Sequence, residues 1–575
     1  MLPVTTLTTI TTIVNNGTMA IQTIPTDEIW IVIAGFVIAF VLAFGIGAND
    51  VANSFATSVG AKVLTLLQAC ILASVFETVG GVLIGAKVSD TIRKGIIDVT
   101  LFAGQEKLLL VGNVAALAGA CVWLLIATIF KMPVSGTHSI VGASLGYALV
   151  AFSGRGIRWI QLLLIVSSWF ISPLLAGGAS VLIFAVIRRF ILDKDEPLDP
   201  GLLFLPFIYA LTVMINVFSI FQSGTPTLGF DNIPLWGSVV LTVGAGLIVG
   251  VLVRCVVVPR MRVKVLEECD TDVTLRKCET KSKEDTAAVS HMRTTSGAVE
   301  VAVLVPKETR KYSRAHSIIG VDPGDHVLRQ LQQPKQKSII GVDPGDHVLR
   351  QLQQPKQKSI IGVDPGDHVL RQLQQPKQKS KGYGTISTEK KDPEKQSERR
   401  TANIQDRVET KTLFTSLQIL TAIFGSFAHG GNDVSNAIGP LVGIWLVSTE
   451  GSVLQESSTP LWLLAFGGVG ICAGLWVLGS RVIETLGEDL TKVTPSSGFC
   501  IETGTALTVL IASNIGIPIS TTHCKVGSVV CTGRFRSKEN VDWTVFRNIV
   551  LAWIVTLPVS GLISAAIFAG LRELV

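Results

Sequence analysis

Long apolar runs separated by short polar connections dominate both ends of this 575-residue chain. Each run has about 20 residues, the length that an α-helix needs to cross a hydrocarbon core of roughly 30 Å. The apolar residues continue around every face of each helix, which soluble helices rarely show. The runs predict about 10 to 12 crossings, and the clearest are Ile29–Gly47, Leu66–Ala86, Leu108–Phe130, Trp159–Ile187, Leu202–Phe221, Leu235–Val258, Leu413–Ala428, Leu461–Gly479, Gly498–Ser513 and Trp543–Ala569.

The composition favours a membrane protein over a large soluble one. Charged residues make up 16% of the chain, whereas an average soluble protein carries about 25%. We therefore predict an all-α polytopic fold in the lipid bilayer. Its N-terminal transmembrane half is 29–258 and its C-terminal half is 412–575, and the polar segment 259–411 joins them.

The joining segment is strongly basic and contains an internal repeat. Residues 259–411 hold 29 of the 49 Lys and Arg and 21 of the 43 Asp and Glu, which gives this segment a net charge of +8. Three identical copies of SIIGVDPGDHVLRQLQQPKQK occupy 317–337, 338–358 and 359–379. Each copy has too few apolar residues to build a core, so we predict a disordered tether. Its charge, and the basic residues beside the neighbouring apolar runs, favour a cytoplasmic position.

The N-terminal tail has the opposite character. Residues 1–28 contain no Lys or Arg and include the sequon Asn16-Gly17-Thr18. An extracellular tail that is glycosylated at Asn16 accounts for both observations.

Two polar motifs occur once in each half, at the edges of apolar runs. The first is G-x-N-D-V-x-N, which begins at Gly47 and again at Gly430. The second is P-x-S-x-T-H, which begins at Pro133 and again at Pro518. A third, weaker match relates 85–91 to 479–485. Three matches in the same order indicate an internal duplication.

The motifs carry complementary chemistry. We expect Gly, Asn and Asp to break an apolar helix, which a membrane tolerates only where the freed polar groups are buried in protein or line a cavity. Their oxygens are hard ligands suited to sodium, and the candidates are Asn49, Asp50, Asn432 and Asp433. A proline followed by hydroxyl residues starts a half-helix whose N–H and O–H groups bind an anion. The candidates for a tetrahedral anion such as phosphate are Ser135, Gly136, Thr137, Ser520, Thr521 and Thr522.

These segments resemble the inorganic phosphate transporter (PiT) family, and specifically its animal type III sodium-dependent cotransporters. The resemblance rests on GANDVANSFATSVG, ACILASVFET, GAKVSDTIRKGIIDV, GSFAHGGNDVSNAIGPLVG and GIPISTTHCKVGSVV, and it covers nearly all of 29–258 and 412–570. It implies two inverted repeats with broken helices and re-entrant hairpins, a homodimer, and sodium-coupled import of phosphate at the plasma membrane.

The resemblance also bears on single residues. It implies that Asp50 and Asp433 are essential and adds two carboxylates, Glu77 and Glu502, to the sodium-coupling residues. When the two halves are aligned, Glu77 falls opposite Ile471, so the coupling is not expected to be shared equally. Sodium is then a transported ion, no cofactor or nucleic-acid partner is expected, and the chain is not an enzyme.

Several alternatives stay open at this point. Glu77 is also placed to pair with Lys62 or Lys87. The histidines His138, His429 and His523 either serve the site or hydrogen-bond a backbone group and so hold a hairpin. The fold also suits proton-coupled phosphate or sulfate transport, or a phosphate-sensing receptor without net transport.

Overall fold

Ten helices that are long and apolar enough to cross a membrane form the body of the computed structural model, counted over the residues that it describes. Those residues are 11–15, 18–22, 24–223, 228–274, 405–480, 490–537 and 540–575. The ten helices coincide with the ten predicted runs, so the all-α polytopic fold is confirmed. The predicted glycosylation site Asn16 and the triplicated repeat 317–379 lie outside the described residues.

The helices follow one another through both halves, and an N-terminal hairpin pairs β1 (Thr11–Asn15) with β2 (Thr18–Gln22) in antiparallel fashion. The N-terminal half contains α1 (Ile29–Ile46), α2 (Ala52–Gly60), α3 (Leu66–Ile84), α4 (Ala86–Asp90), α5 (Glu106–Ile129), α6 (Gly136–Phe152), α7 (Trp159–Ile187), α8 (Leu198–Ser223) and α9 (Leu235–Leu252). The C-terminal half contains α16 (Val408–Glu450), α17 (Leu461–Leu478), α19 (Pro495–Ile515), α20 (Thr521–Arg536) and α21 (Trp543–Leu571).

Two pairs of these helices form hairpins whose tips are the proline motifs. The segment that contains Pro133 separates α5 from α6, and the segment that contains Pro518 separates α19 from α20. An antiparallel bridge closes the base of each hairpin, Ile97 with Ile157 in the first and Thr491 with Val541 in the second.

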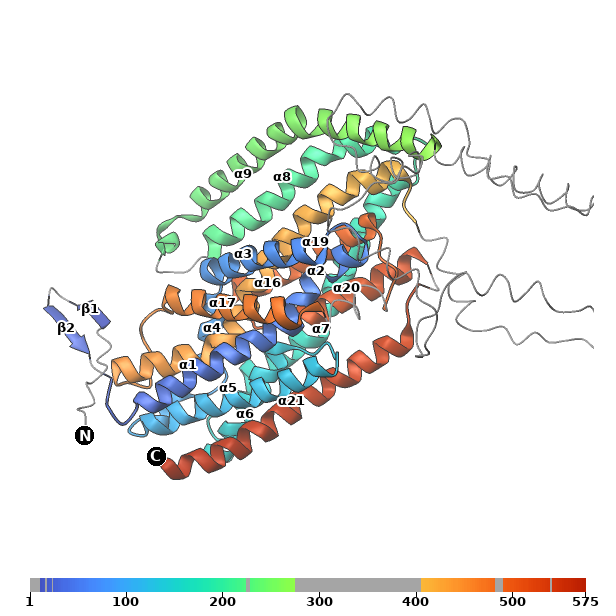
Figure 1. Ribbon diagram of the computed structural model, residues 1–575. Coiled ribbons are helices and arrows are strands. Elements are labelled where there is room, and N and C mark those ends of the chain that lie inside the picture. The colour runs from blue at the N-terminus through green and yellow to red at the C-terminus, as the bar shows by residue number, and fades with distance from the viewer. Residues whose placement is uncertain are drawn as a thin grey trace, which may run out of the picture. The chain divides into compact units, whose positions relative to one another are not determined.

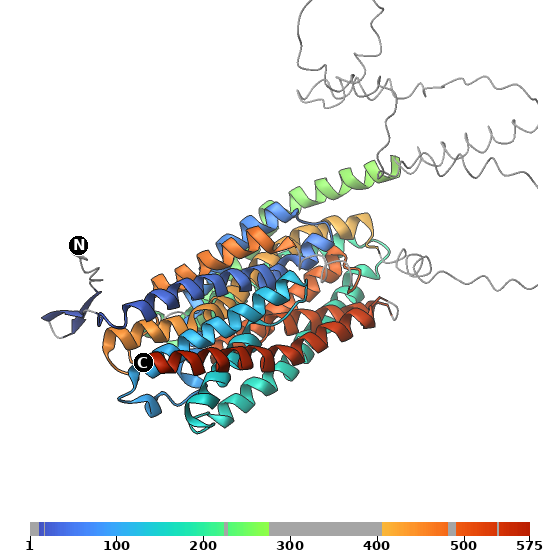
Figure 2. The ribbon, with the colours of Figure 1, turned by 60° about the horizontal axis from the view of Figure 1, so that its bottom comes forward.

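The two hairpins enter the helical body from opposite ends (Figure 1). At the base of the first, Lys107 bonds Asp27, just before α1 begins. At the base of the second, Arg536 bonds Asp406, just before α16 begins, at 2.9 Å. The start of α1 and the end of α21 lie at one end of the helical body, and the start of α16 lies at the other (Figures 1 and 2).

The first helix of each half packs against the second long helix of the other half, α1 on α17 and α16 on α3. The same motif glycine makes both crossings possible. A Cβ on Gly47 would lie 1.9 Å from the Ile471 carbonyl oxygen, and a Cβ on Gly430 would lie 2.1 Å from that of Glu77. Any side chain would therefore force these helices apart. The two contacts also place Glu77 and Ile471 at matching positions, as the aligned sequences predict.

The Asn-Asp motifs do not end their helices, which corrects one expectation. In the first half the chain passes through a π-helical turn, Gly47–Val51, between α1 and α2. In the second half α16 runs from Val408 to Glu450 without a break. The polar side chains of the motif find partners on neighbouring helices, so the backbone hydrogen bonds need not be given up. In the first motif the helix is widened by a π-turn, as is frequent at functional sites.

The helix that begins at Leu235 continues to Thr274, past the end of its apolar run at Val258. Its polar extension lies beside other basic helix ends. Arg262 bonds Asp199 at the start of α8, and Arg407 donates to the Lys194 carbonyl at 3.1 Å. The basic flanks of α7, α9 and α16 therefore gather at one end of the helical body.

Candidate functional site

The tips of the two hairpins meet and exchange hydrogen bonds. The Thr137 hydroxyl of the first tip donates to the Ile519 carbonyl of the second at 2.7 Å. The Thr522 hydroxyl lies 3.2 Å from the Val134 carbonyl. These threonines occupy the same motif position, as do the two carbonyls, so the contact is reciprocal.

Each hairpin tip is shaped by a serine that starts the returning helix. Ser135 accepts from the His138 N–H at 3.3 Å, and Ser520 accepts from the His523 N–H at 3.1 Å. Both are N-caps, which satisfy donors at a helix start and favour helix formation there. The two serines predicted to bind an anion therefore also have a structural role.

Asp50 lies directly against both tips and is 1% exposed. Its carboxylate accepts from the Gly136 N–H at 2.8 Å and from the Thr522 hydroxyl at 2.6 Å. These are two of the donors that the sequence assigns to an anion. Thr522 comes from the opposite half, so one bond joins the cation motif of one half to the anion motif of the other.

The side chain of Asn49 bonds the backbone of the first hairpin tip. Its side-chain amide donates to the Met132 carbonyl and to the Thr128 hydroxyl, each at 3.0 Å, and its carbonyl oxygen accepts from the Val134 N–H at 3.0 Å. The predicted sodium ligand thus has all its polar atoms engaged with the tip.

The matching residue in the second half is engaged differently. Asn432 donates to Asp433 at 2.9 Å and to the Ile519 carbonyl at 3.0 Å, while its own oxygen has no hydrogen-bond partner among the described residues. Asn436, one helical turn later, donates to Thr137 at 2.8 Å and likewise keeps an unpaired buried oxygen. Asp433 accepts from the Thr521 hydroxyl at 3.3 Å. Unpaired oxygens thus lie beside a buried carboxylate.

Glu77 is fully buried on α3 and has hydroxyl partners rather than Lys62 or Lys87. Ser54 and Ser426 donate to its Oε1 at 3.2 and 3.0 Å, and its Oε2 has no hydrogen-bond partner among the described residues. Ser54 also lies 2.6 Å from His429 Nδ1. Lys87 instead donates to a carbonyl of α8.

Glu502 has a denser set of donors. Its Oε1 accepts from Thr57 at 2.5 Å and from Ser58 at 2.7 Å, and Thr421 lies 3.3 Å from its Oε2. Lys525, which no motif argument identified, lies 3.9 Å away with its ammonium group buried.

The histidines of the proline motifs pack behind the tips. The His138 and His523 rings lie 4.3 Å apart, and each also packs on a tryptophan of a long helix, Trp169 of α7 and Trp553 of α21. His523 Nδ1 lies 3.1 Å from the Trp169 carbonyl. For His523, the prediction of a backbone contact that holds the hairpin is therefore confirmed.

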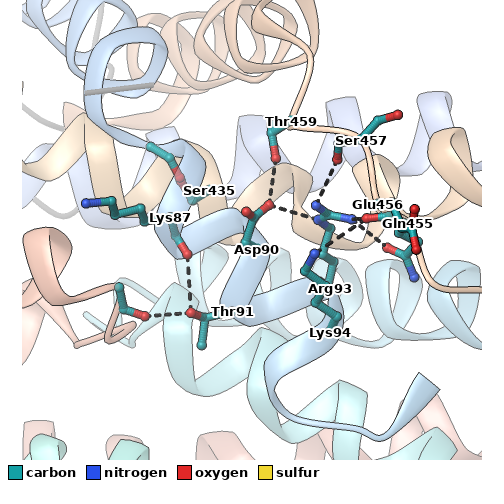
Figure 3. A network of polar contacts seen from close by, with 12 residues as sticks. Lys87, Asp90, Thr91, Arg93, Lys94, Ser435, Gln455, Glu456, Ser457 and Thr459 are labelled. Atoms are coloured by element: carbon teal, nitrogen blue, oxygen red, sulfur yellow. Dashed lines mark hydrogen bonds and ion pairs between the residues drawn. The ribbon is translucent and has the colours of Figure 1, made fainter. Parts of the chain in front are cut away.

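The weaker third motif, 85–91, forms a separate polar network (Figure 3). Arg93 is 4% exposed and bonds Asp90 at 2.9 Å and the Gln455 carbonyl at 2.7 Å. Thr91 donates to the Gly516 carbonyl at 2.7 Å. The motif therefore ties α4 and the π-helical turn that follows it, Thr91–Gly95, to the α16–α17 loop and to the second hairpin tip.

Four carboxylates are buried in this region. Asp50 and Asp433 contact the hairpin tips, whereas Glu77 and Glu502 accept from hydroxyl groups of neighbouring helices. Among the described residues, Lys525 pairs with Glu502. Carboxylates are costly inside a membrane unless they meet cations. Sequence reasoning missed Asn436, Ser54 and Lys525. Asn436 had a signal, because it is the last residue of the shared G-x-N-D-V-x-N pattern.

Comparisons with known proteins agree with this geometry. The profile of the Phosphate transporter family matches residues 46–564. Sodium-dependent phosphate transporter 1 of Homo sapiens is 42% identical over 96% of this chain and 97% of its own length. Sodium-dependent phosphate transporter 1-B of Danio rerio is 42% identical over 95% of this chain and 96% of its own. A solved structure titled "The sodium-dependent phosphate transporter" matches 95% of this chain and 100% of its own with a TM-score of 0.65 and 29% identity.

Proposed function

Because this chain belongs to the phosphate transporter family, we propose that it carries inorganic phosphate across the membrane together with sodium, by alternating access. The family consists of transporters, so the chain is not an enzyme. The observation that carries the proposal is the junction at the hairpin tips. There the donors expected for an anion contact Asp50 and Asp433, the residues expected to bind cations.

We assign phosphate to the two hairpin tips. Gly136, Thr137, Thr521 and Thr522 supply N–H and O–H donors from two helix starts, one in each half, and Ser135 and Ser520 fix those starts. Helix N-termini favour anions through their free N–H groups and their dipoles. Two such starts suit one tetrahedral anion held from two sides.

We assign sodium to the carboxylates and the unpaired oxygens beside them. Asp433 with the Asn432 and Asn436 oxygens forms one ligand set, Asp50 belongs to the cation side of the first half, and the free Oε2 of Glu77 offers a further ligand. Asn49, whose amide is engaged by the first tip, positions that tip rather than binding the ion.

The hydrogen bonds of Thr522 indicate how the two solutes are coupled. A hydroxyl has one proton, so Thr522 cannot donate to Asp50 and to phosphate at once. Sodium that binds Asp50 replaces the hydroxyl as the partner of the carboxylate and releases the proton for phosphate. Each solute therefore raises the affinity for the other, as thermodynamic linkage requires.

We further infer that the two halves form an inverted repeat, which is supported by their reciprocal contacts. Hairpin helix α6 packs on α21, and α20 packs on α7. The hairpins are anchored near the starts of α1 and α16, which lie at opposite ends of the helical body. Two halves of opposite orientation can open the same site to either side in turn.

The orientation in the plasma membrane is also a proposal, with the N-terminal tail extracellular and the segment 259–411 cytoplasmic. It is supported by basic residues beside helix ends: Arg188 directly follows α7, and Arg262 and Arg407 lie within the segment itself, near its two ends. Positive residues near helix ends favour the cytoplasmic side. Glycosylation at Asn16 in cells, lost in Asn16→Gln, would test this orientation.

Uptake of labelled phosphate into proteoliposomes tests the function. We expect accumulation driven by an inward sodium gradient, with little uptake under potassium or proton gradients and no competition by sulfate. Uptake driven by protons alone, or inhibited by sulfate, would favour the related transporter types. Phosphate binding without accumulation would indicate a sensor.

The assignment of the aspartates is tested by Asp50→Asn and Asp433→Asn. Each should abolish sodium-driven uptake while leaving the protein correctly inserted. Near-normal transport by either variant would show that the cation site is elsewhere.

A further inference from the structure

Lys525 is a charged side chain in an unusual place, buried on α20 two residues after the second hairpin motif. It is 2% exposed, and its Nζ lies 3.9 Å from Glu502 Oε1 and 3.4 Å from the Ser54 carbonyl. An isolated charge at this depth is costly, and a buried pair with further hydrogen bonds is the arrangement in which both groups stay ionised. We therefore treat Lys525 and Glu502 as an ion pair.

The surroundings of Glu502 consist of donors. Thr57 and Ser58 donate to Oε1, which is also the oxygen nearest the Lys525 ammonium. Thr421 donates to Oε2. Glu77 differs, because among the described residues no Lys or Arg forms an ion pair with it and its Oε2 has no hydrogen-bond partner. The family resemblance assigns the same role to both glutamates, but their surroundings differ. Glu77 is able to bind a cation, whereas Glu502 is already paired with the Lys525 ammonium.

Alignment of the two halves shows that Glu502 and Lys525 occur together in one half and are both absent from the matching positions of the other. His138 matches His523, so Lys525 falls opposite Ile140. Gly119 and Gly504 make matching contacts, with Ser564 and Ser180 at the same position of α21 and α7, so Glu502 falls opposite Leu117. One half therefore has two buried hydrocarbon side chains where the other has a carboxylate and an ammonium. Because the carboxylate and the ammonium have opposite charges, the pair adds no net charge to the half that contains it.

We propose that Lys525 is a built-in counter-cation that keeps Glu502 from binding a transported ion. Cation binding then falls to Asp50, Asp433 and Glu77 alone. This inference rests on the proposed sodium-coupled transport and removes Glu502 from the sodium ligands predicted by resemblance.

The number of sodium ions taken up per phosphate tests the proposal. Lys525→Met removes the ammonium and leaves a buried carboxylate that recruits sodium, so the ratio of labelled sodium to labelled phosphate should rise by one. The double variant Lys525→Ile with Glu502→Leu installs the residues of the other half, and its ratio should equal that of the parent. Lys87→Met, which removes an ammonium that donates to the exposed Gln222 carbonyl, is the matched control and should not change the ratio.

Two results would overturn the proposal. One is an unchanged ratio in Lys525→Met. The other is a ratio one lower than the parental value in the double variant, which would mean that Glu502 carries a transported sodium. If a variant is folded but does not transport, the number of sodium ions bound at equilibrium by the purified protein decides in the same way. A parent protein whose uptake ignores sodium would instead refute the proposed function, so the two failures are distinguishable.

Discussion

The hydroxyl of Thr522 provides the sharpest test of the phosphate site. It donates to Asp50 at 2.6 Å. In the proposed cycle, sodium binds Asp50 and the hydroxyl then donates to phosphate instead. A hydrogen bond to a charged group contributes about 1.5–3 kcal/mol. At about 1.4 kcal/mol per tenfold change, its loss should raise the apparent KM for phosphate roughly 10- to 150-fold.

Thr522→Val is the appropriate change, because valine keeps the shape of the side chain and removes the hydroxyl. The KM for phosphate should be measured in proteoliposomes at saturating sodium, since KM does not depend on how much protein inserts. Thr508→Val is the matched control. The Thr508 hydroxyl donates at 2.9 Å to the Gly504 carbonyl of its own helix, so its KM should stay within about twofold of the parental value. A Thr522→Val protein with a comparably small change would refute the assignment of this donor to phosphate.

Three further outcomes are expected, two of them from the packing of the helices. Gly47→Ala or Gly430→Ala should abolish folding or greatly lower the thermal unfolding temperature, because the added Cβ overlaps a carbonyl oxygen; Gly425→Ala, which meets open space, should be stable. Arg93→Gln should lower the unfolding free energy by about 1–3 kcal/mol, since it removes bonds to the α16–α17 loop; an unchanged melting curve would contradict this. Deletion of 317–379 should leave phosphate uptake intact, and loss of uptake by a correctly inserted protein would show that this segment is more than a tether.

The membrane helices were predictable because the bilayer sets their length and apolarity. The hairpin tips were predictable because Pro133 and Pro518 are each followed by a serine that caps a new helix. The course of α16 through Asn432 and Asp433 was not predictable from local sequence. There, contacts with the second hairpin tip outweigh the tendency of these residues to interrupt a helix.

Identical motif residues also proved to have different surroundings. Asn49 and Asn432 occupy the same motif position, yet one amide is fully engaged by a hairpin tip and the other keeps an unpaired oxygen. Sequence patterns fix which residue types meet, but the atoms that remain free depend on sub-ångström placement of neighbours. Lys525 was overlooked for a related reason, because its meaning depends on Glu502, which is distant in sequence.

Some contacts occur in both halves, whereas Glu77 has no counterpart carboxylate in the other half. This difference bears on what drives the proposed transport cycle. In the proposed inverted repeat, alternating access requires that the two halves exchange roles at little cost, and the reciprocal glycine crossings and tip contacts support this. The Glu502–Lys525 pair is neutral, so it adds no net charge to either arrangement. Glu77, opposite Ile471, is the carboxylate that distinguishes the halves. A ligand shifts a conformational equilibrium only by its differential affinity for the two states. In the proposed cycle, sodium binding at Glu77 is therefore the event that favours one orientation over the other.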